Sequence, residues 1–187
     1  MEIKKVKIQE WFENIGKYLA NREEHLCYAI QDQTEITYGL EGDCDTEWCE
    51  QNNIPAYNIQ SSGGCIVHPK GNISVGMVYS ANKHNGFVLA QTIRDFADYL
   101  KQKGLSVEML GNDVMVDNFK VASAAEFQYD VENQWCYGIM QFSINQDLEV
   151  IEHACKKPMV KIPKGLSEYG ITTEEIKNWL LETVSKL

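Results

Sequence analysis

The sequence predicts an α+β domain with a mixed, largely antiparallel sheet flanked by helices. Runs of alternating or β-branched residues are separated by short polar turns, which is the pattern of hairpins. Helical periodicity is set among these runs without strict βαβ alternation, so a doubly wound nucleotide-binding fold is not expected. A chain of 187 residues suits one domain, which we expect to span residues 1–187.

Four helices are predicted from apolar spacing and end signals, over residues 6–19, 86–103, 147–155 and 172–186. The second has apolar residues at helical spacing and is followed by Gly104 as a stop signal. Asp147 opens the third helix. The fourth begins with TTEEI, a threonine cap followed by acidic residues that favour a helix N-terminus.

Strands are predicted between these helices from β-branched and aromatic runs. They are expected over residues 26–31, 35–41, 56–60, 65–68, 73–80, 106–110, 113–117, 119–130 and 134–144. The first two strands read as a hairpin. The turns DNFK and DVENQ between the later strands are short and polar, as hairpins require.

Composition and charge exclude several classes of partner. The formal net charge is −10 with only two arginines, Arg22 and Arg94, so nucleic acid is not expected as a partner. The N-terminus is charged throughout, and no apolar run approaches the roughly 20 residues of a membrane span. Without a signal sequence, the six cysteines read as reduced thiols, and we expect a cytoplasmic protein without membrane contact.

The stretch SSGGCIVHPKGN, residues 61–72, places two adjacent glycines before a short strand and a histidine with a cationic turn after it. One interpretation is an ordinary corner, in which the glycines only supply positive φ between two strands. The other is a backbone kept bare so that a ligand can lie on it. Neither the GxGxxG pattern nor a GxxxxGK phosphate loop is present.

A second segment, GNDVMVDNFKVASAA, covers residues 111–125. Asn112 and Asp113 offer an amide and a carboxylate at a loop mouth, and carboxylate oxygens are ligands that Mg²⁺ takes alongside nucleotide phosphates. Lys120 sits early in a strand and is followed by small residues, which allow a ligand to approach closely. A lysine held there can stabilise negative charge that develops on a carboxylate or a phosphate.

Taken together, these two segments resemble the lipoate–protein ligase A and octanoyltransferase family, which belongs to the biotin/lipoate A/B protein ligases. The family motifs read Arg-Arg-x-Ser-Gly-Gly-Gly-x-Val-x-His-x-x-Gly-Asn and Lys-x-x-Gly-x-Ala. The tail FSINQDLEVIEHACKKPMVKIPKGLSEYGIT is similar as well, so the resemblance covers about residues 26–185. It implies a mixed-sheet α+β fold related to the biotin ligase catalytic domain, here without an accessory C-terminal domain.

The resemblance implies an ATP- and Mg²⁺-dependent ligase that activates lipoate or octanoate as an acyl-adenylate. The acyl group would then pass to a lysine of a lipoyl carrier domain, either a glycine cleavage H protein or an E2-type domain. A separate accessory subunit is a further expected partner. The implied roles are catalysis for Lys120, phosphate or Mg²⁺ binding for Asn112 and Asp113, and substrate or nucleotide binding for Ser62, Gly63, Gly64, Cys65, His68, Lys70, Gly71, Asn72, Ser123 and Ala124.

The sequence departs from the family motifs at several positions. Ile59 and Gln60 stand where the family has two arginines, Cys65 replaces the third glycine, and Ser123 replaces the glycine after the lysine. Each lost charge-assisted hydrogen bond to phosphate is worth about 1.5–3 kcal/mol. Lys70 could supply one replacement cation.

Two alternatives stay open. The first is an ATP-independent lipoyl or octanoyl transferase that uses a cysteine thioester, for which Cys155 is the candidate nucleophile and Cys65 a second one. The other interpretation of Cys155 is that it has no catalytic role and is a small apolar residue at the end of a helix. The second alternative is a non-catalytic lipoyl- or acyl-binding member of the fold. The basic run KKPMVKIPKG, residues 156–165, is either a solvated linker or a surface for an acidic carrier.

Overall fold

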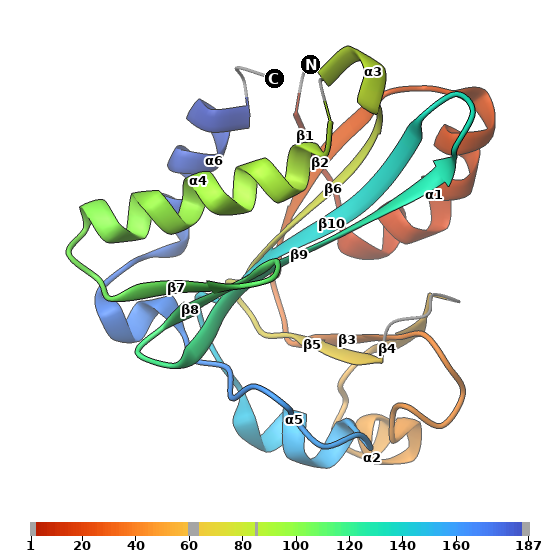
Figure 1. Ribbon diagram of the computed structural model, residues 1–187. Coiled ribbons are helices and arrows are strands. Elements are labelled where there is room, and N and C mark those ends of the chain that lie inside the picture. The colour runs from red at the N-terminus through yellow and green to blue at the C-terminus, as the bar shows by residue number, and fades with distance from the viewer. Residues whose placement is uncertain (1–2, 60–63, 85, 185–187) are drawn as a thin grey trace.

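The computed structural model describes residues 3–59, 64–84 and 86–184 (Figure 1). It contains a seven-stranded sheet in the order β1-β2-β6-β10-β9-β8-β7 and a three-stranded sheet in the order β4-β3-β5. Among the strand pairs of the described residues, β1–β2 and β3–β4 are parallel and the others are antiparallel. The predicted α+β class with a mixed, largely antiparallel sheet is therefore confirmed.

The bounds of the elements follow the chain. The strands are β1 (Lys4–Lys5), β2 (His25–Ile30), β3 (Glu35–Tyr38), β4 (Ala56–Asn58), β5 (Cys65–His68), β6 (Ile73–Ser80), β7 (Val107–Leu110), β8 (Asp113–Val116), β9 (Phe119–Asp130) and β10 (Trp135–Phe142). The helices are α1 (Ile8–Asn21), α2 (Thr46–Gln51), α3 (Ala81–His84), α4 (Val88–Gln102), α5 (Leu148–Ala154) and α6 (Thr173–Val184), with a 3₁₀ turn at Leu166–Tyr169. Among the described residues, no helix is long and apolar enough to cross a membrane.

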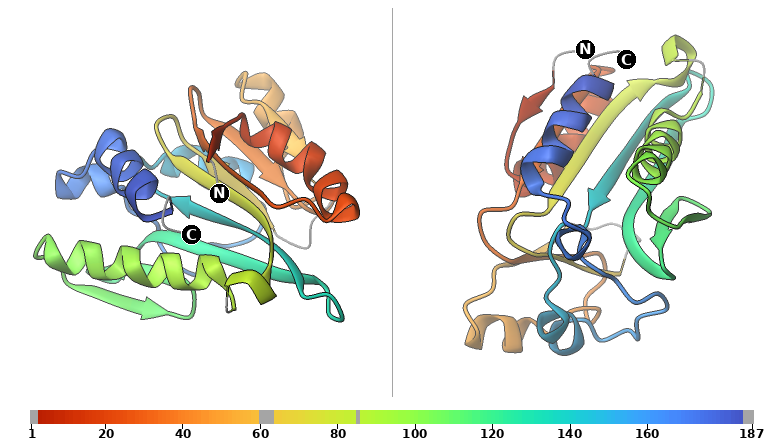
Figure 2. Two further views of the ribbon diagram at one scale, coloured as in Figure 1. Left: turned by 90° about the horizontal axis from the view of Figure 1, so that it is seen from above. Right: turned by 90° about the vertical axis from the view of Figure 1, so that its left-hand side faces the viewer.

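The large sheet is covered on both faces, as the views in Figure 2 show. Helices α4 and α6 pack on one face, where the main apolar core includes Phe96, Phe142 and Leu180. Helix α1 packs on the other face through Trp11. Strand β6 lies between them with all eight of its residues buried, so it forms the centre of the molecule.

The small sheet has its own apolar cluster, which it shares with α2 and α5 below it in Figure 1. The predicted hairpin of residues 26–31 and 35–41 is wrong, because β2 and β3 belong to different sheets. Both edges of β2 are occupied, one by β1 and the other by β6, so β3 has no edge to join. Strands β4 and β5 flank β3 on opposite sides and do not pair with each other.

The four predicted helices are confirmed as α1, α4, α5 and α6, with ends shifted by one or two residues. Asp147 caps α5, since its Oδ1 accepts a hydrogen bond from the Val150 N–H at 3.2 Å. Helix α2 was not predicted, although it has the same local signal: Asp45 accepts from the Trp48 N–H at 3.0 Å. Its six residues are too few to show helical periodicity.

Candidate functional site

Lys120 lies in a cluster of two lysines and one aspartate. Its Nζ is 3.1 Å from Asp113 Oδ1, and the Lys161 Nζ contacts the other carboxylate oxygen, Oδ2. The three side chains are between 19% and 33% exposed, so a ligand can reach them while water screens them only in part. With two ammonium groups and one carboxylate, the cluster has a net charge of about +1 and suits an anion.

The β8–β9 hairpin and a later segment bring these residues together. The hairpin turns at Asp117 and Asn118, which both have positive φ, and it sets Asp113 opposite Ser123. Residues 162–164 run beside the start of β9: the Lys120 N–H donates to the Ile162 carbonyl at 3.0 Å, and the Lys164 N–H donates to the Lys120 carbonyl at 3.0 Å. These bonds hold Lys161 next to Asp113, although the two are 48 positions apart in the sequence.

A row of residues crosses five strands of the large sheet on the face toward the small sheet. Strand pairing places its members directly opposite one another, in the order Ala29, Ser74, Gln141, Ser123, Asp113. Residues opposite each other share a face of a sheet. The adjacent pair Val114 and Ala122 points into the main core instead, because side chains alternate along a strand. The row therefore ends at the Lys120 cluster.

His68 lies over the middle of this row and is buried. Its Nδ1 is 3.4 Å from Gln141 Nε2, and its Nε2 is 2.8 Å from Thr37 Oγ1. The Gln141 amide also donates to the Val67 carbonyl at 3.2 Å, so Gln141 connects the two sheets. Burial lowers the pKa of His68 to about 4, which leaves the imidazole neutral near pH 7. His68 can therefore orient groups by hydrogen bonding but does not supply a cation there.

Sequence reasoning missed Gln141 and Lys161. A polar residue in the apolar run QWCYGIMQFSI was the available signal for Gln141. Lys161 carried no signal of its own, because it is one of four lysines in residues 156–165. All four form ion pairs with acids of the chain: Lys156 with Asp45, Lys157 with Asp43, Lys161 with Asp113, Lys164 with Glu168. The run is therefore less cationic than its sequence indicates.

Hydrogen bonds to neighbouring segments fix the position of the turn that follows His68. Gly71 has φ +88, and its N–H donates to the Gln31 carbonyl at 2.8 Å. Asn72 is buried, and its Oδ1 accepts the Asn145 N–H at 2.7 Å. The Asn145 side-chain amide donates a hydrogen bond to the backbone carbonyl of Lys70. Lys70 itself is exposed. The contacts of Gly71 and Asn72 are thus with protein backbone, including the Asn145 N–H, and with the side chain of Thr173, whose hydroxyl donates to the Gly71 carbonyl at 2.9 Å.

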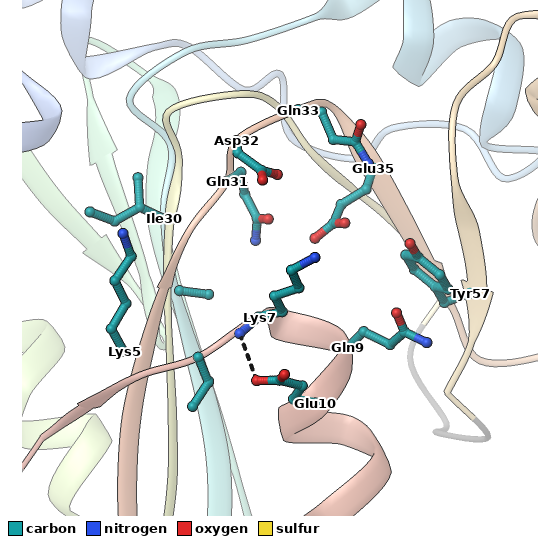
Figure 3. A pocket seen from close by; sticks show the side chains of 12 residues that line it. Lys5, Lys7, Gln9, Glu10, Ile30, Gln31, Asp32, Gln33, Glu35 and Tyr57 are labelled. Carbon is teal, nitrogen blue, oxygen red and sulfur yellow. Dashed lines mark hydrogen bonds between the residues drawn. The ribbon is translucent and has the colours of Figure 1, made fainter.

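A cavity of about 580 Å³ opens at the other end of the row, beside Ala29 (Figure 3). Gln31, Glu35 and Tyr57 line it, and the Lys7 side chain points toward Glu35. Glu35 stands opposite His68 in the β3–β5 pairing. Burial raises the pKa of the Glu35 carboxyl, and the charge of Asp32 raises it further.

The Gln31 side chain is a buried polar group in the lining of this cavity. Gln31 is 5% exposed, and its Nε2 has no hydrogen-bond partner within the described part of the chain. Of the predicted site residues that the structure describes, none lines this cavity. A smaller cavity of about 380 Å³ shares Gln9 and Tyr57 with it and reaches Ile59, two positions before the stretch of residues 61–72.

The remaining predicted residues occupy three places. Ser62 and Gly63 lie outside the described residues, and the Gly64 carbonyl accepts the Gly39 N–H at 3.3 Å. Cys65 and Cys155 lie together at the base of the small sheet, apart from the row. Ala124 packs against the main core, and its N–H donates to the Asn112 carbonyl at 3.0 Å.

The predicted Mg²⁺ ligands do not form a metal site by themselves. Both carboxylate oxygens of Asp113 already contact ammonium groups. Within residues 3–59, 64–84 and 86–184, no group of three or more His, Cys, Asp or Glu side chains is arranged to hold a metal ion. A cation at Asp113 would have to displace two lysines.

The fold is shared with solved lipoate ligases. P. falciparum LipL1 in complex with lipoate matches with a TM-score of 0.75 at 15% identity, over 98% of this chain and 60% of that chain. The bipartite lipoate protein ligase of Thermoplasma acidophilum, studied with its E2 lipoyl domain, gives a TM-score of 0.73 at 15% identity, over 100% and 83% of the two chains. A lipoate-protein ligase A bound with ATP gives 0.71 at 16% identity, over 100% and 85%.

This chain spans 60% of the P. falciparum protein to which it is similar. A comparison with curated protein sequences finds no match. The family model described as the lipoyl protein ligase A/B catalytic domain matches residues 7–185, nearly the whole sequence. The chain belongs to the lipoyl protein ligase A/B catalytic domain family.

Proposed function

We propose that this chain is an ATP-dependent ligase for lipoate or octanoate. The carboxylate of the acid attacks the α-phosphorus of ATP, and pyrophosphate leaves, which gives an acyl-adenylate. The ε-amine of a lysine on a lipoyl carrier domain then attacks the acyl carbonyl, and AMP leaves. The carrier is a glycine cleavage H protein or an E2-type domain, and the single catalytic domain acts alone or with an accessory subunit.

The observation that carries this proposal is the row from the cavity to the Lys120 cluster. A ligand lying along it would have its acyl chain near Ala29 and Tyr57 and its carboxylate toward Lys120. The small residues in the row leave room for this, since Ser123 and Ala29 project little from the sheet. Gln141 and His68 are the polar groups above its middle.

Lys120 and Lys161 have matched roles in this proposal. Each would exchange its contact with Asp113 for an oxygen of the acyl carboxylate or of the α-phosphate, where negative charge develops during adenylation. Lys161 would supply a cation that the glycine-rich stretch lacks, because Ile59 and Gln60 stand in place of the family's arginines. Asp113 would keep both ammonium groups positioned before the ligand arrives.

Mg²⁺ enters the proposal as part of the ATP substrate. Asp113 is a poor resident ligand while two lysines occupy its oxygens, so no step here depends on a metal held by the chain. Ser62, Gly63, Gly64 and Lys70 remain candidates for contacts with the nucleotide. The lipoate, ATP and E2 lipoyl domain of the related structures support the same ligands for this chain.

The test is calorimetric titration with ATP·Mg²⁺ and with lipoate or octanoate, followed by an assay of pyrophosphate release. We expect the wild-type chain to bind both and to release pyrophosphate only when both are present. Lys120→Ala should lower the rate by about 100-fold or more, the usual cost of removing one preorganised donor. Lys161→Ala should weaken ATP binding about tenfold, which corresponds to about 1.4 kcal/mol.

Lys101→Ala is the matched control, because Lys101 is an exposed lysine on α4 paired with Asp98. It should leave binding and turnover unchanged. Absence of ATP binding at millimolar concentration would reject the ligase and favour the non-catalytic member of the fold. Equal loss in all three lysine variants would show a general charge effect rather than a role of the cluster.

A second candidate function is acyl transfer through a cysteine thioester. Cys155 is partly exposed, and its interaction with the Cys65 side chain lowers the pKa of its thiol, which favours the nucleophilic thiolate. This function predicts transfer from octanoyl carrier protein without ATP and a hydroxylamine-sensitive octanoyl adduct on Cys155. If Cys155→Ala keeps full activity, the thioester route is excluded.

A further inference from the structure

Four of the six cysteines meet at the base of the small sheet. Cys44 precedes α2, Cys49 lies on α2, Cys65 opens β5, and Cys155 follows α5. They belong to one apolar cluster, whereas Cys27 and Cys136 are buried in the two clusters of the large sheet. Two of the segments are 90 positions apart in the sequence, so only the fold brings these thiols together.

The outer pair of this cluster is Cys65 and Cys155, and both residues are partly exposed. Cys155 Sγ lies 3.7 Å from the Cys65 carbonyl oxygen, and Cys65 Sγ lies 3.9 Å from the Ala154 carbonyl oxygen. The two thiols are also close enough to shift each other's pKa. The Cys155 sulfur thus lies beside the backbone of Cys65, and the Cys65 sulfur lies beside the residue that precedes Cys155, so the two side chains are neighbours, as a disulfide requires.

The inner pair is Cys44 and Cys49, which are only 4% and 1% exposed. Their sulfurs are 3.7 Å apart, and Cys44 forms an antiparallel bridge with Cys155 through the backbone. Burial raises the pKa of Cys44 to about 12 and raises that of Cys49. These thiols are therefore protonated and shielded from a dissolved oxidant.

The outer thiols differ from each other in a way that sets the order of reaction. The interaction between the two thiols lowers the pKa of Cys155 and raises that of Cys65, whose pKa is raised further by burial. Cys155 is the thiol that forms the attacking thiolate, and Cys65 is the neighbour placed to resolve a mixed disulfide.

We propose that Cys65 and Cys155 form a reversible disulfide with a small-molecule disulfide such as oxidised glutathione as the oxidant. The Cys155 thiolate attacks one sulfur of the oxidant, forms a mixed disulfide and releases one glutathione thiolate. Cys65 then loses its proton to solvent, attacks the Cys155 sulfur and releases the second glutathione. The two protein thiols lose two electrons and two protons, and the oxidant is reduced to two thiols.

The linkage joins two parts of the chain that flank the candidate site. Cys65 directly follows the two adjacent glycines, and Cys155 is six positions before Lys161, which contacts Asp113. A disulfide would tether the start of β5 to the end of α5. It would also exclude thioester formation at Cys155, because that sulfur would no longer be free.

The test uses the full chain equilibrated in glutathione buffers of increasing oxidised fraction. Free thiols are blocked with N-ethylmaleimide, and peptides are mapped by mass spectrometry without reduction. We expect a Cys65–Cys155 linked peptide whose yield rises with the oxidised fraction and disappears with dithiothreitol. Cys27 and Cys136 should remain alkylated as internal controls. A Cys44–Cys49 link, glutathione adducts alone or no linkage would each overturn the proposal.

Variants check the order of reaction. Cys65→Ser should leave Cys155 as a stable glutathione adduct, whereas Cys155→Ser should give no adduct on Cys65. Cys49→Ala is the matched control within the cluster and should keep the Cys65–Cys155 link; its loss would contradict the assigned pair. The main test measures the masses of linked peptides from the wild-type chain. Its outcome does not depend on whether the proposed ligase activity is found.

Discussion

At the residue scale, His68 shows how burial changes what a motif residue can do. It is enclosed by Thr37 and Gln141 from two different sheets, and among the described residues its side chain hydrogen-bonds to no carboxylate. An imidazolium in that position would lose its hydration without gaining an ion pair, so the neutral form is favoured. The histidine is better suited to hold the two sheets in register than to bind phosphate as a cation.

His68 should make the protein lose stability in acid. Its folded-state pKa of about 4 is below the unfolded value of 6.5, so its contribution is fully present above pH 6.5 and is lost as pH falls toward 4. A pKa lowered to this extent corresponds to about 3 kcal/mol of unfolding free energy at neutral pH. Urea unfolding of wild type and His68→Gln at pH 7 and pH 4.5 should show a smaller drop for the variant. If the unfolding free energy of both proteins falls equally, folding does not lower the pKa of His68.

Two glycines give opposite expectations for the same substitution. A Cβ at Gly76 would overlap the Trp11 indole, which packs on β6, so Gly76→Ala should destabilise the protein by about 1–3 kcal/mol. Gly16 lies within α1 with nothing near its Cβ position, so Gly16→Ala should stabilise by about 0.5–1 kcal/mol. Chemical denaturation measures both. A neutral Gly76→Ala would show that α1 can move away from the sheet.

At the scale of elements, helix α4 is capped by a residue of another element. Its N-cap position is Phe87, which has no capping side chain. The Glu126 carboxylate on β9 accepts the Leu89 and Ala90 N–H groups, each at 2.8 Å, and the Tyr79 hydroxyl at 2.6 Å. A carboxylate at a helix N-terminus also interacts favourably with the helix dipole. This contact fixes α4 on the large sheet.

Glu126→Ala should therefore cost about 2–3 kcal/mol of unfolding free energy, because it leaves buried donors without a charged acceptor. Glu132→Ala, in the exposed turn between β9 and β10, is the control and should change stability by less than about 0.5 kcal/mol. Thermal and urea unfolding provide the measurement. Similar losses in both variants would argue against a specific cap.

At the scale of the whole molecule, the two sheets should differ in local stability. Strand β6 is buried along its length and paired on both sides by β2 and β10. The small sheet has three short strands and a smaller apolar cluster, and Gln141 connects it to the large sheet. Regions with fewer buried contacts open at a lower free energy than the global unfolding.

Native-state hydrogen exchange in increasing denaturant should therefore show two units. Amides of β6 and β10 should exchange only by global unfolding, and amides of β3 and β5 should exchange by a lower-energy opening that carries α2 and α5 with it. Mass spectrometry of peptides from both sheets tests this. One common exchange free energy would mean that the molecule opens as a single unit.

Local features of the sequence determined most elements of this protein. Apolar periodicity and Asp147 predicted α4 and α5, and the short polar turns predicted the β8–β9 and β9–β10 hairpins, because these signals act within a few residues. The two motif segments also indicated the family, which the match over residues 7–185 confirms.

Only the tertiary structure decided which distant segments meet. It separated β2 from β3 by filling both edges of β2, placed Gln141 under His68, brought Lys161 to Asp113 and set Cys155 beside Cys65. Strand register and the docking of residues 156–164 depend on the packing of the whole chain, and no short window of sequence contains that information.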